Sequence, residues 1–381
     1  MKRIIYIIGI VGMVVASLSC NSKMAVEDKN TDNTQTGTVF SNNYHSLSLA
    51  SKPVLSVERS TIYSPGNKDW HYAHHPSIAY FKGKFIAIFS NGIKGEDEAG
   101  QRVLIAMSDN FKEWSWKVLQ DTDMEHVLTP GGLLVADDNL LVAYYTQNEF
   151  AKNGRPDARL YALKSSDGIT WSEPIDLGIS IFPCHRPIRL KSGRLVLTGN
   201  RDVFYTDDPI GLSGWVAAKK SDYASGVKPS LVEGAIIECK DSVYILFRDT
   251  KGRTLLWQES SLKGDSWSVP QKTKFTDNNT KSFLGKLPDG KTYYVGVPDT
   301  LKMGARTPLV LSLSDNEFHF NKHYIIANDN YDIKYSDGRW KEGQFGYPFS
   351  MIHDNHIYVV ASRRKETIEV IRIPVNKIDI D

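Results

Sequence analysis

Histidines and a tryptophan crowd the start of the first apolar hairpin in this chain, in the stretch WHYAHHPSIAYFKGKFIAIFSN at 70–91. The second half of the stretch alternates apolar residues on either side of a Lys-Gly-Lys turn, which predicts a β-hairpin. The imidazoles therefore precede a strand entrance. Imidazole titrates near neutral pH, so residues of this type suit general acid–base chemistry.

The same hairpin pattern returns along the chain. Apolar strand pairs flank turns marked by Gly83, Asp138, Gly193, Asp241, Gly290 and Asp354, which follow one another at roughly 50-residue intervals. Behind most hairpins lies a second strand pair closed by Ser, Asp and an aromatic residue, as in SSDGITW at 165–171. A period near 50 with four strands per unit predicts an all-β fold, a β-propeller of four-stranded blades.

Six hairpins predict six blades, and the last unit lacks a fourth strand. The segment PVLSVERS from Pro53 is expected to supply that strand and close the ring, which removes the sheet edges. The stretch 300–345 is long enough to contain a further strand pair, so seven blades remain an alternative.

The phase of the repeat brings polar residues to one face. The inner strand of a blade and its neighbour are antiparallel, so the start of the first and the end of the second lie together. Positions about eight residues before the turn markers include His75, His185, Glu233 and Gly346, which adjoins Tyr347; positions about eight residues after them include Asn91, Arg201, Arg248 and Arg363. Any one of these could merely satisfy backbone groups in a channel. Together they predict a basic pocket for an anionic ligand such as a uronate carboxylate. Desolvation and repulsion make a cluster of charged side chains unfavourable if it only fills space.

Composition and ends fit an exported protein. The formal charge of +2 and 41% hydrophobic content suit a globular protein and give no reason to expect nucleic acid as partner. Residues 1–20 have a Lys-Arg start and an apolar run before Cys20, as in a signal sequence. They resemble a bacterial lipoprotein signal, in which Cys20 is lipidated; a plain secretory signal is the alternative. We expect a flexible tether over 21–51, a propeller catalytic domain over 52–381, and a place in the periplasm or at the outer-membrane surface.

The remaining cysteines, Cys184 and Cys239, are expected to be free, because the repeat places them at opposite ends of neighbouring strands, on the order of 20 Å apart. No Cys/His cluster has zinc spacing, and we expect neither metal nor cofactor. The acidic loop GEDEAGQRV from Gly95 is expected to be mostly solvated surface.

Several runs resemble a known family of enzymes: HHPSIAYFKGKF, CHRPIRLKSGRLVLTGN, KSFLGKLPDGKTYYVG and GYPFSMIHD among them. The family comprises secreted propellers that cleave L-rhamnose from α-1,4-linked glucuronic acid, as in arabinogalactan, with ulvan lyases and sialidase-like propellers as more distant relatives. The resemblance covers residues 53–376 and implies seven blades. It also implies metal-free β-elimination or hydrolysis of a uronate-containing glycan.

The resemblance also implies roles for individual residues. His75 and His185 match the histidine-bearing strands and are expected to transfer protons. Arg248 and Arg201 are expected to hold the carboxylate, and Tyr145 is the expected phenol, with Tyr144 as its rival. Glu233, Tyr347 and Asn91 complete the predicted substrate site.

Other functions stay open from sequence. An α-L-rhamnosidase would hydrolyse the same linkage. A sialidase would require an arginine triad, for which Arg189, Arg201 and Arg248 are available, and a Tyr/Glu nucleophile pair. A non-catalytic glycan-binding propeller is the third alternative, and the oligomeric state is open.

Overall fold

The computed structural model describes residues 38–45, 52–67, 69–137, 139–150 and 158–378. The predicted signal segment with Cys20 lies outside the described residues. Among the described residues, no helix has the length and apolar character needed to cross a membrane.

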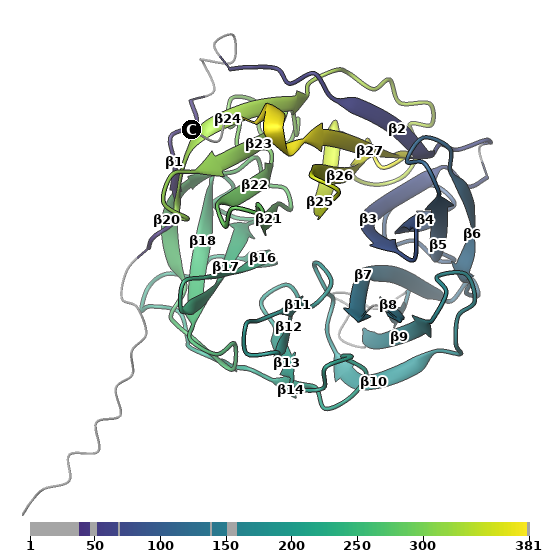
Figure 1. The fold of residues 1–381 in the computed structure, drawn as a ribbon, viewed down its shortest axis with the longest axis horizontal. Helices are drawn as coiled ribbons and strands as arrows, with labels where there is room; N and C mark the ends of the chain where they lie inside the picture. Colours follow the sequence, from purple (N-terminus) through teal and green to yellow (C-terminus); the bar gives the residue numbers. More distant parts are fainter. Residues whose placement is uncertain (1–37, 46–51, 68, 138, 151–157, 379–381) are drawn as a thin grey trace, which may run out of the picture. The chain divides into compact units, whose positions relative to one another are not determined.

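Four-stranded antiparallel sheets surround a common centre, with the strands β3, β7, β11, β16, β21 and β25 innermost (Figure 1). The first two blades are β3 (Tyr72–Phe81), β4 (Lys84–Gly92), β5 (Arg102–Ser108) and β6 (Ser115–Gln120), then β7 (His126–Asp137), β8 (Leu140–Glu149), β9 (Arg159–Ser165) and β10 (Ile175–Ser180). The third has the shorter strands β11 (Ile188–Arg189), β12 (Leu195–Thr198), β13 (Val203–Thr206) and β14 (Val216–Ala217).

The next two blades share one nine-stranded sheet. They are β16 (Leu231–Cys239), β17 (Ser242–Asp249), β18 (Leu255–Ser261) and β20 (Gln271–Thr276), then β21 (Phe283–Lys286), β22 (Thr292–Gly296), β23 (Leu309–Ser314) and β24 (His319–Ala327). Strand β1 (Ser41–Asn42) joins their outer edges by pairing with β20 and β24. Between the third and fourth blades, β15 (Lys219–Lys220) pairs with β19 (Ser266–Trp267).

The last blade closes the ring with an N-terminal strand, as predicted, although this strand is Glu58–Tyr63 and overlaps the expected segment only at residues 58–60. It contains β25 (Phe345–His353), β26 (His356–Arg363), β27 (Thr367–Pro374) and β2 (Glu58–Tyr63), and the short 3₁₀ helix η2 (Val375–Lys377) follows β27. The described residues thus form six blades, and each of the six predicted hairpins is present. The seventh blade implied by the family resemblance is not found among the described residues.

Two predictions about the chain outside the blades have different outcomes. Cys184 and Cys239 are free and buried, as expected. The tether predicted over 21–51 is wrong for residues 38–45, because β1 is part of a sheet and Phe40 and Tyr44 are buried. The prediction failed because it used the overall polar composition of the segment, in which these two aromatic residues are surrounded by polar ones.

The core lies between the blades, where apolar strand residues of one sheet pack on the next. Ile86, Ile88 and Ile105 of the first blade pack with Leu133 and Leu141 of the second. The Ser-Asp-Trp turns are stabilised by local hydrogen bonds: Asp167 Oδ1 accepts hydrogen bonds from the amides of Ile169 and Thr170, both at 2.8 Å.

Candidate active site in the central cavity

Three inner strands carry the same irregularity at the same level. In β3, β16 and β25, two consecutive residues stand opposite one residue of the neighbouring strand, which is a β-bulge. The first bulge residues are His75, Glu233 and Tyr347, with φ of 54°, 57° and 51°. A side chain in this left-handed region is strained. The bulge re-aims each side chain, and all three line one cavity.

This cavity, of about 400 Å³, is lined largely by ionisable groups. The acidic ones are Glu96, Asp97 and Glu233, and the basic ones are His75, Arg248, Arg253, Arg306 and Lys365; Asn200, Asn279, Thr250, Phe182, Val232, Trp340 and Tyr347 complete the wall. Strands of three blades contribute to this one site, together with loops that include those after β4, β17, β22, β24 and β26.

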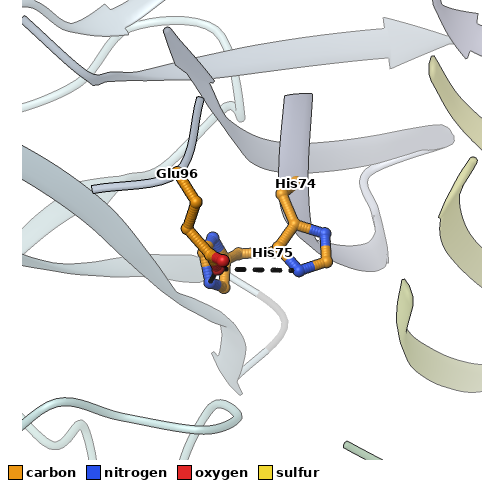
Figure 2. Close-up of side chains that lie close together, drawn as sticks. All are labelled: His74, His75 and Glu96. Atoms are coloured by element: carbon orange, nitrogen blue, oxygen red, sulfur yellow. Dashed lines mark ion pairs between the residues drawn. The ribbon is translucent and has the colours of Figure 1, made fainter. Parts of the chain in front are cut away.

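Two adjacent imidazoles converge on one carboxylate (Figure 2). His75 Nε2 lies 3.1 Å from Glu96 Oε1, and His74 Nε2 lies 3.8 Å from the same oxygen. Hydroxyl groups fix the other ring nitrogens: Ser90 Oγ lies 2.9 Å from His75 Nδ1, and Ser362 Oγ lies 2.7 Å from His74 Nδ1. The second oxygen of Glu96 is ion-paired with Lys365, which is also buried.

Burial governs the protonation of this group. Desolvation lowers the pKa of His75 below its ordinary value, although Glu96 opposes the shift. For His74 desolvation and the neighbouring imidazole lower the pKa well below the ordinary range. Burial alone would raise the pKa of Glu96, but the ammonium of Lys365 and the imidazoles hold it well below its usual value. At neutral pH the group therefore contains neutral imidazoles and a carboxylate.

A phenol–carboxylate–guanidinium cluster faces the imidazoles. The Tyr347 hydroxyl donates a hydrogen bond to Glu233 Oε1. Arg248 is ion-paired with the same carboxylate: its Nη2 donates a hydrogen bond to Oε1 at 2.8 Å, and its Nε lies 2.6 Å from Oε2. The ring of Tyr347 lies 4.2 Å from that of His74 and 5.2 Å from that of His75, measured between centroids. The two clusters are therefore in contact.

The charges of this second cluster are well defined. Burial and the charge of Glu233 raise the pKa of Tyr347 well above its ordinary value, so the phenol stays protonated. Burial would raise the pKa of Glu233, but Arg248 lowers it, and the group is a carboxylate. The carbonyl of Asn279 accepts hydrogen bonds from Arg248 at 2.9 Å and Arg306 at 3.3 Å, which positions both guanidinium groups.

His74, His75 and Glu96 are the group of described residues whose ligand atoms lie close enough to hold a metal ion, within 4.8 Å of one another. The chemistry of the neighbourhood opposes a cation, because Lys365 already neutralises the carboxylate and Arg306 lies in the same cavity. Charge–charge repulsion in a buried site is strong. The arrangement fits proton transfer and anion binding better than metal coordination.

His185, predicted to act with His75, lies elsewhere. It lines a second cavity of about 500 Å³ with Arg186, Arg189 and Phe349, formed by residues nearer the turn ends of the inner strands. Its Nε2 donates a hydrogen bond to the Ser282 carbonyl at 2.9 Å. The counting rule assumed a regular strand before each turn, but residues 182–187 do not belong to a strand.

Other predicted residues are engaged in structural contacts. Tyr145 is buried in the core between the first two blades and stacks on Tyr161, with 5.5 Å between centroids. Asn91 donates to the Tyr72 carbonyl at 3.0 Å and accepts from Arg102. Arg201 pairs with the buried Glu259 at 2.9 Å. These residues do not line the cavity that contains His75.

The remaining named residues also lie apart from this cavity. Tyr144 is buried and donates to the Gly211 carbonyl at 3.1 Å. Arg363 is buried with Asp329 and Glu369, each at 3.0 Å. Of the arginines considered for a sialidase triad, Arg248 is the one that lines the His75 cavity; the other arginines in its wall are Arg253 and Arg306 rather than Arg189 and Arg201.

Sequence reasoning missed most of the loop residues of the site, among them Glu96, Arg253, Arg306, Trp340 and Lys365. Glu96 was expected on a solvated loop and is buried. Arg306, Trp340 and Lys365 come from segments outside the inner hairpins, so the repeat gives no phase for them. The three adjacent acidic residues after the first hairpin were the available signal for Glu96.

The fold places the protein among sialidase-like β-propellers. A Trypanosoma rangeli sialidase in complex with sialic acid superposes with a TM-score of 0.63 at 13% identity, over 86% of this chain and 60% of that one. A protein of unknown function from Dyadobacter fermentans gives a TM-score of 0.62 at 16% identity, covering 84% of this chain and 99% of that one. A further sialidase matches at 15% identity with a TM-score of 0.60, over 85% of this chain and 33% of that chain. This chain thus spans 60% and 33% of the two sialidases.

The family follows from the sequence. The model of the BNR repeat-like domain matches residues 83–359, most of the propeller, and the chain belongs to that family. Comparison with curated proteins gives no match.

Proposed function

We propose that the protein cleaves a glycan at a carboxylate-bearing sugar bound in the His75 cavity. One observation carries the proposal: a single cavity joins a neutral imidazole, a buried Tyr347–Glu233 pair and three arginines. Arginine side chains suit a carboxylate. Phenol, imidazole and carboxylate supply nucleophilic and acid–base groups. We further propose that the protein acts outside the cytoplasm, as its N-terminal sequence suggests.

The Tyr347–Glu233 pair favours hydrolysis. The phenol oxygen attacks the anomeric carbon while Glu233 takes the phenol proton, and the imidazolium form of His75 protonates the departing oxygen. Water then attacks the same carbon and gives a proton to His75, while Tyr347 leaves and regains its proton from Glu233. A neutral nucleophile suits a sugar whose carboxylate adjoins the anomeric carbon, because a carboxylate nucleophile would be repelled. Sialic acid, which the trypanosomal sialidase binds, is such a sugar.

Elimination at L-rhamnose-α-1,4-glucuronate is the second candidate, and the neutral His75 favours it. In that reaction the imidazole takes the C5 proton, a double bond forms between C4 and C5, and the C4–oxygen bond breaks. Tyr347 then protonates the departing oxygen. Arg253 and Arg306 would neutralise the uronate carboxylate, and this neutralisation would make the C5 proton more acidic.

Product analysis on gum arabic, ulvan and sialyl-lactose tests the proposal. Elimination gives the ultraviolet absorbance of an unsaturated uronate, and hydrolysis gives free sugar without it. The pH profile has opposite signs in the two reactions: hydrolysis slows as pH rises through the pKa of His75, whereas elimination accelerates.

The His75→Ala and His185→Ala variants locate the site. We expect a loss of at least ~100-fold in turnover for His75→Ala and less than ~10-fold for His185→Ala. The reverse pattern would place the reaction in the second cavity and contradict the proposal. Binding of these glycans without turnover by the wild type would establish a glycan-binding propeller instead.

A further inference from the structure

Trp340 stands at the mouth of the His75 cavity with its side chain in solvent. It lines the cavity, yet it is 63% exposed, whereas His75 and Tyr347 in the same wall are buried. Its backbone is left-handed, with φ of 63°. Single exposed hydrophobic side chains are common on protein surfaces. Here the exposed aromatic ring borders a charged cavity and stands on a left-handed backbone, and such strained residues cluster where ligands bind.

The backbone on both sides of Trp340 is fixed. Gly338, with φ of 97°, packs so closely on the loop after β4 that a Cβ atom there would lie 1.9 Å from the Lys94 carbonyl oxygen. On the other side, Lys341 is buried and ion-paired with Glu366 at 3.5 Å, and its carbonyl accepts a hydrogen bond from Arg364 at 2.9 Å.

The buried Glu366 organises the rest of the loop. Its carboxylate accepts hydrogen bonds from the amides of Lys334 at 3.0 Å and Tyr335 at 2.8 Å. The backbone that carries the indole is therefore held in a defined place rather than on a freely moving segment. A rigid aromatic surface binds a ligand with little loss of conformational freedom.

We propose that Trp340 is a stacking platform for the sugar ring next to the acidic sugar, on the solvent side of the site. The inference rests on the proposed function and adds a second subsite to it. The buried part of the cavity carries the charged groups that suit the acidic sugar. The mouth offers an apolar ring face, which suits the apolar face of a neutral pyranose. The protein should therefore prefer an acidic sugar in an oligosaccharide to the free acidic monosaccharide.

Calorimetric titration in a Tyr347→Phe background, which prevents turnover, tests this subsite. The probes are free N-acetylneuraminate and glucuronate, with sialyl-lactose and an acid-released gum arabic oligosaccharide as their extended counterparts. Trp340→Ala and Trp340→Phe are compared with Trp116→Ala, which removes an exposed tryptophan of the outer strand β6. Thermal melting confirms that each variant is folded.

We expect Trp340→Ala to weaken oligosaccharide binding roughly 10-fold, with monosaccharide binding changed by less than about 2-fold. Trp340→Phe should recover most of the affinity, and Trp116→Ala should bind like the parent. Unchanged oligosaccharide binding by Trp340→Ala, in a parent that binds both kinds of probe, overturns the subsite and leaves the proposed function intact. A parent protein that binds none of the probes, with wild type equally inert, overturns both.

Discussion

Replacing Tyr347 with phenylalanine separates chemistry from stability at the centre of the site. The variant loses the hydroxyl that donates to Glu233. It keeps the ring that packs 4.2 Å from His74 and needs no change of backbone. Both proposed reactions use the phenol proton, so both predict a large loss of turnover.

The two effects differ in size. Loss of a group that transfers a proton or attacks in the transition state costs about 10²–10⁴ in kcat, or roughly 3–5 kcal/mol of activation free energy. The stability effect is smaller. A hydrogen bond to a charged group contributes about 1.5–3 kcal/mol, and Glu233 keeps the two contacts from Arg248 at 2.6 and 2.8 Å. We therefore expect the free energy of unfolding to fall by about 1.5 kcal/mol.

Turnover is measured on the glycan that the wild type cleaves, and stability by urea denaturation. Tyr144→Phe is the matched control, because Tyr144 is also buried and its hydroxyl donates to the Gly211 carbonyl at 3.1 Å. That variant should lose about 1 kcal/mol of stability and keep wild-type turnover. If Tyr347→Phe retained more than about a tenth of the activity, the phenol would have no part in the reaction.

Three further predictions concern the imidazoles and Glu96. The folded-state pKa values of His74, His75 and His185 lie below the ordinary 6.5, so the unfolded chain binds protons first as the pH falls. The free energy of unfolding should then decrease from about pH 6.5 toward those folded values, by up to ~1.4 kcal/mol per pH unit for each histidine; constant stability between about pH 7 and 5 would contradict this. Glu96→Gln leaves Lys365 buried without its partner and should lower the free energy of unfolding by ~3–5 kcal/mol, as measured by urea denaturation. The additional change Lys365→Met should restore most of this stability but no activity. Treatment with a chelator should leave turnover unchanged, because Lys365 occupies the carboxylate that a metal ion would need; an activity restored only by added zinc would refute this.

The architecture could be predicted because its signals are local. Alternation of apolar residues and turn residues such as Gly83, Gly193 and Asp354 determine each hairpin from a dozen neighbouring residues. The closing strand β2 could be predicted because the last unit lacked a partner for β27. Strand β1 could not, since two residues among polar neighbours have no period to detect.

Only the site residues that lie on the repeated hairpins could be predicted from the sequence. His75, Glu233, Arg248 and Tyr347 share a cavity because they occupy matching positions on hairpins that carry the same β-bulge. His185 has the matching sequence offset, but the chain before β11 is not a strand, so the offset does not give its position in space. Glu96 and the other loop residues depend on how segments distant in sequence pack, which a period cannot encode.

The backbone itself gives an independent argument for the location of the site. Sixteen described residues other than glycine have a positive φ, and nine of these are among the fifteen residues that line the His75 cavity. Each left-handed non-glycine residue costs on the order of 1 kcal/mol, and glycine would remove that cost. Most of the others, such as Lys82 and Asp354, lie in hairpin turns, where the backbone needs the conformation. No turn explains the bulges at His75, Glu233 and Tyr347. The strain there coincides with the side chains that we propose take part in the reaction. We therefore attribute it to the positioning of these side chains rather than to the stability of the sheet.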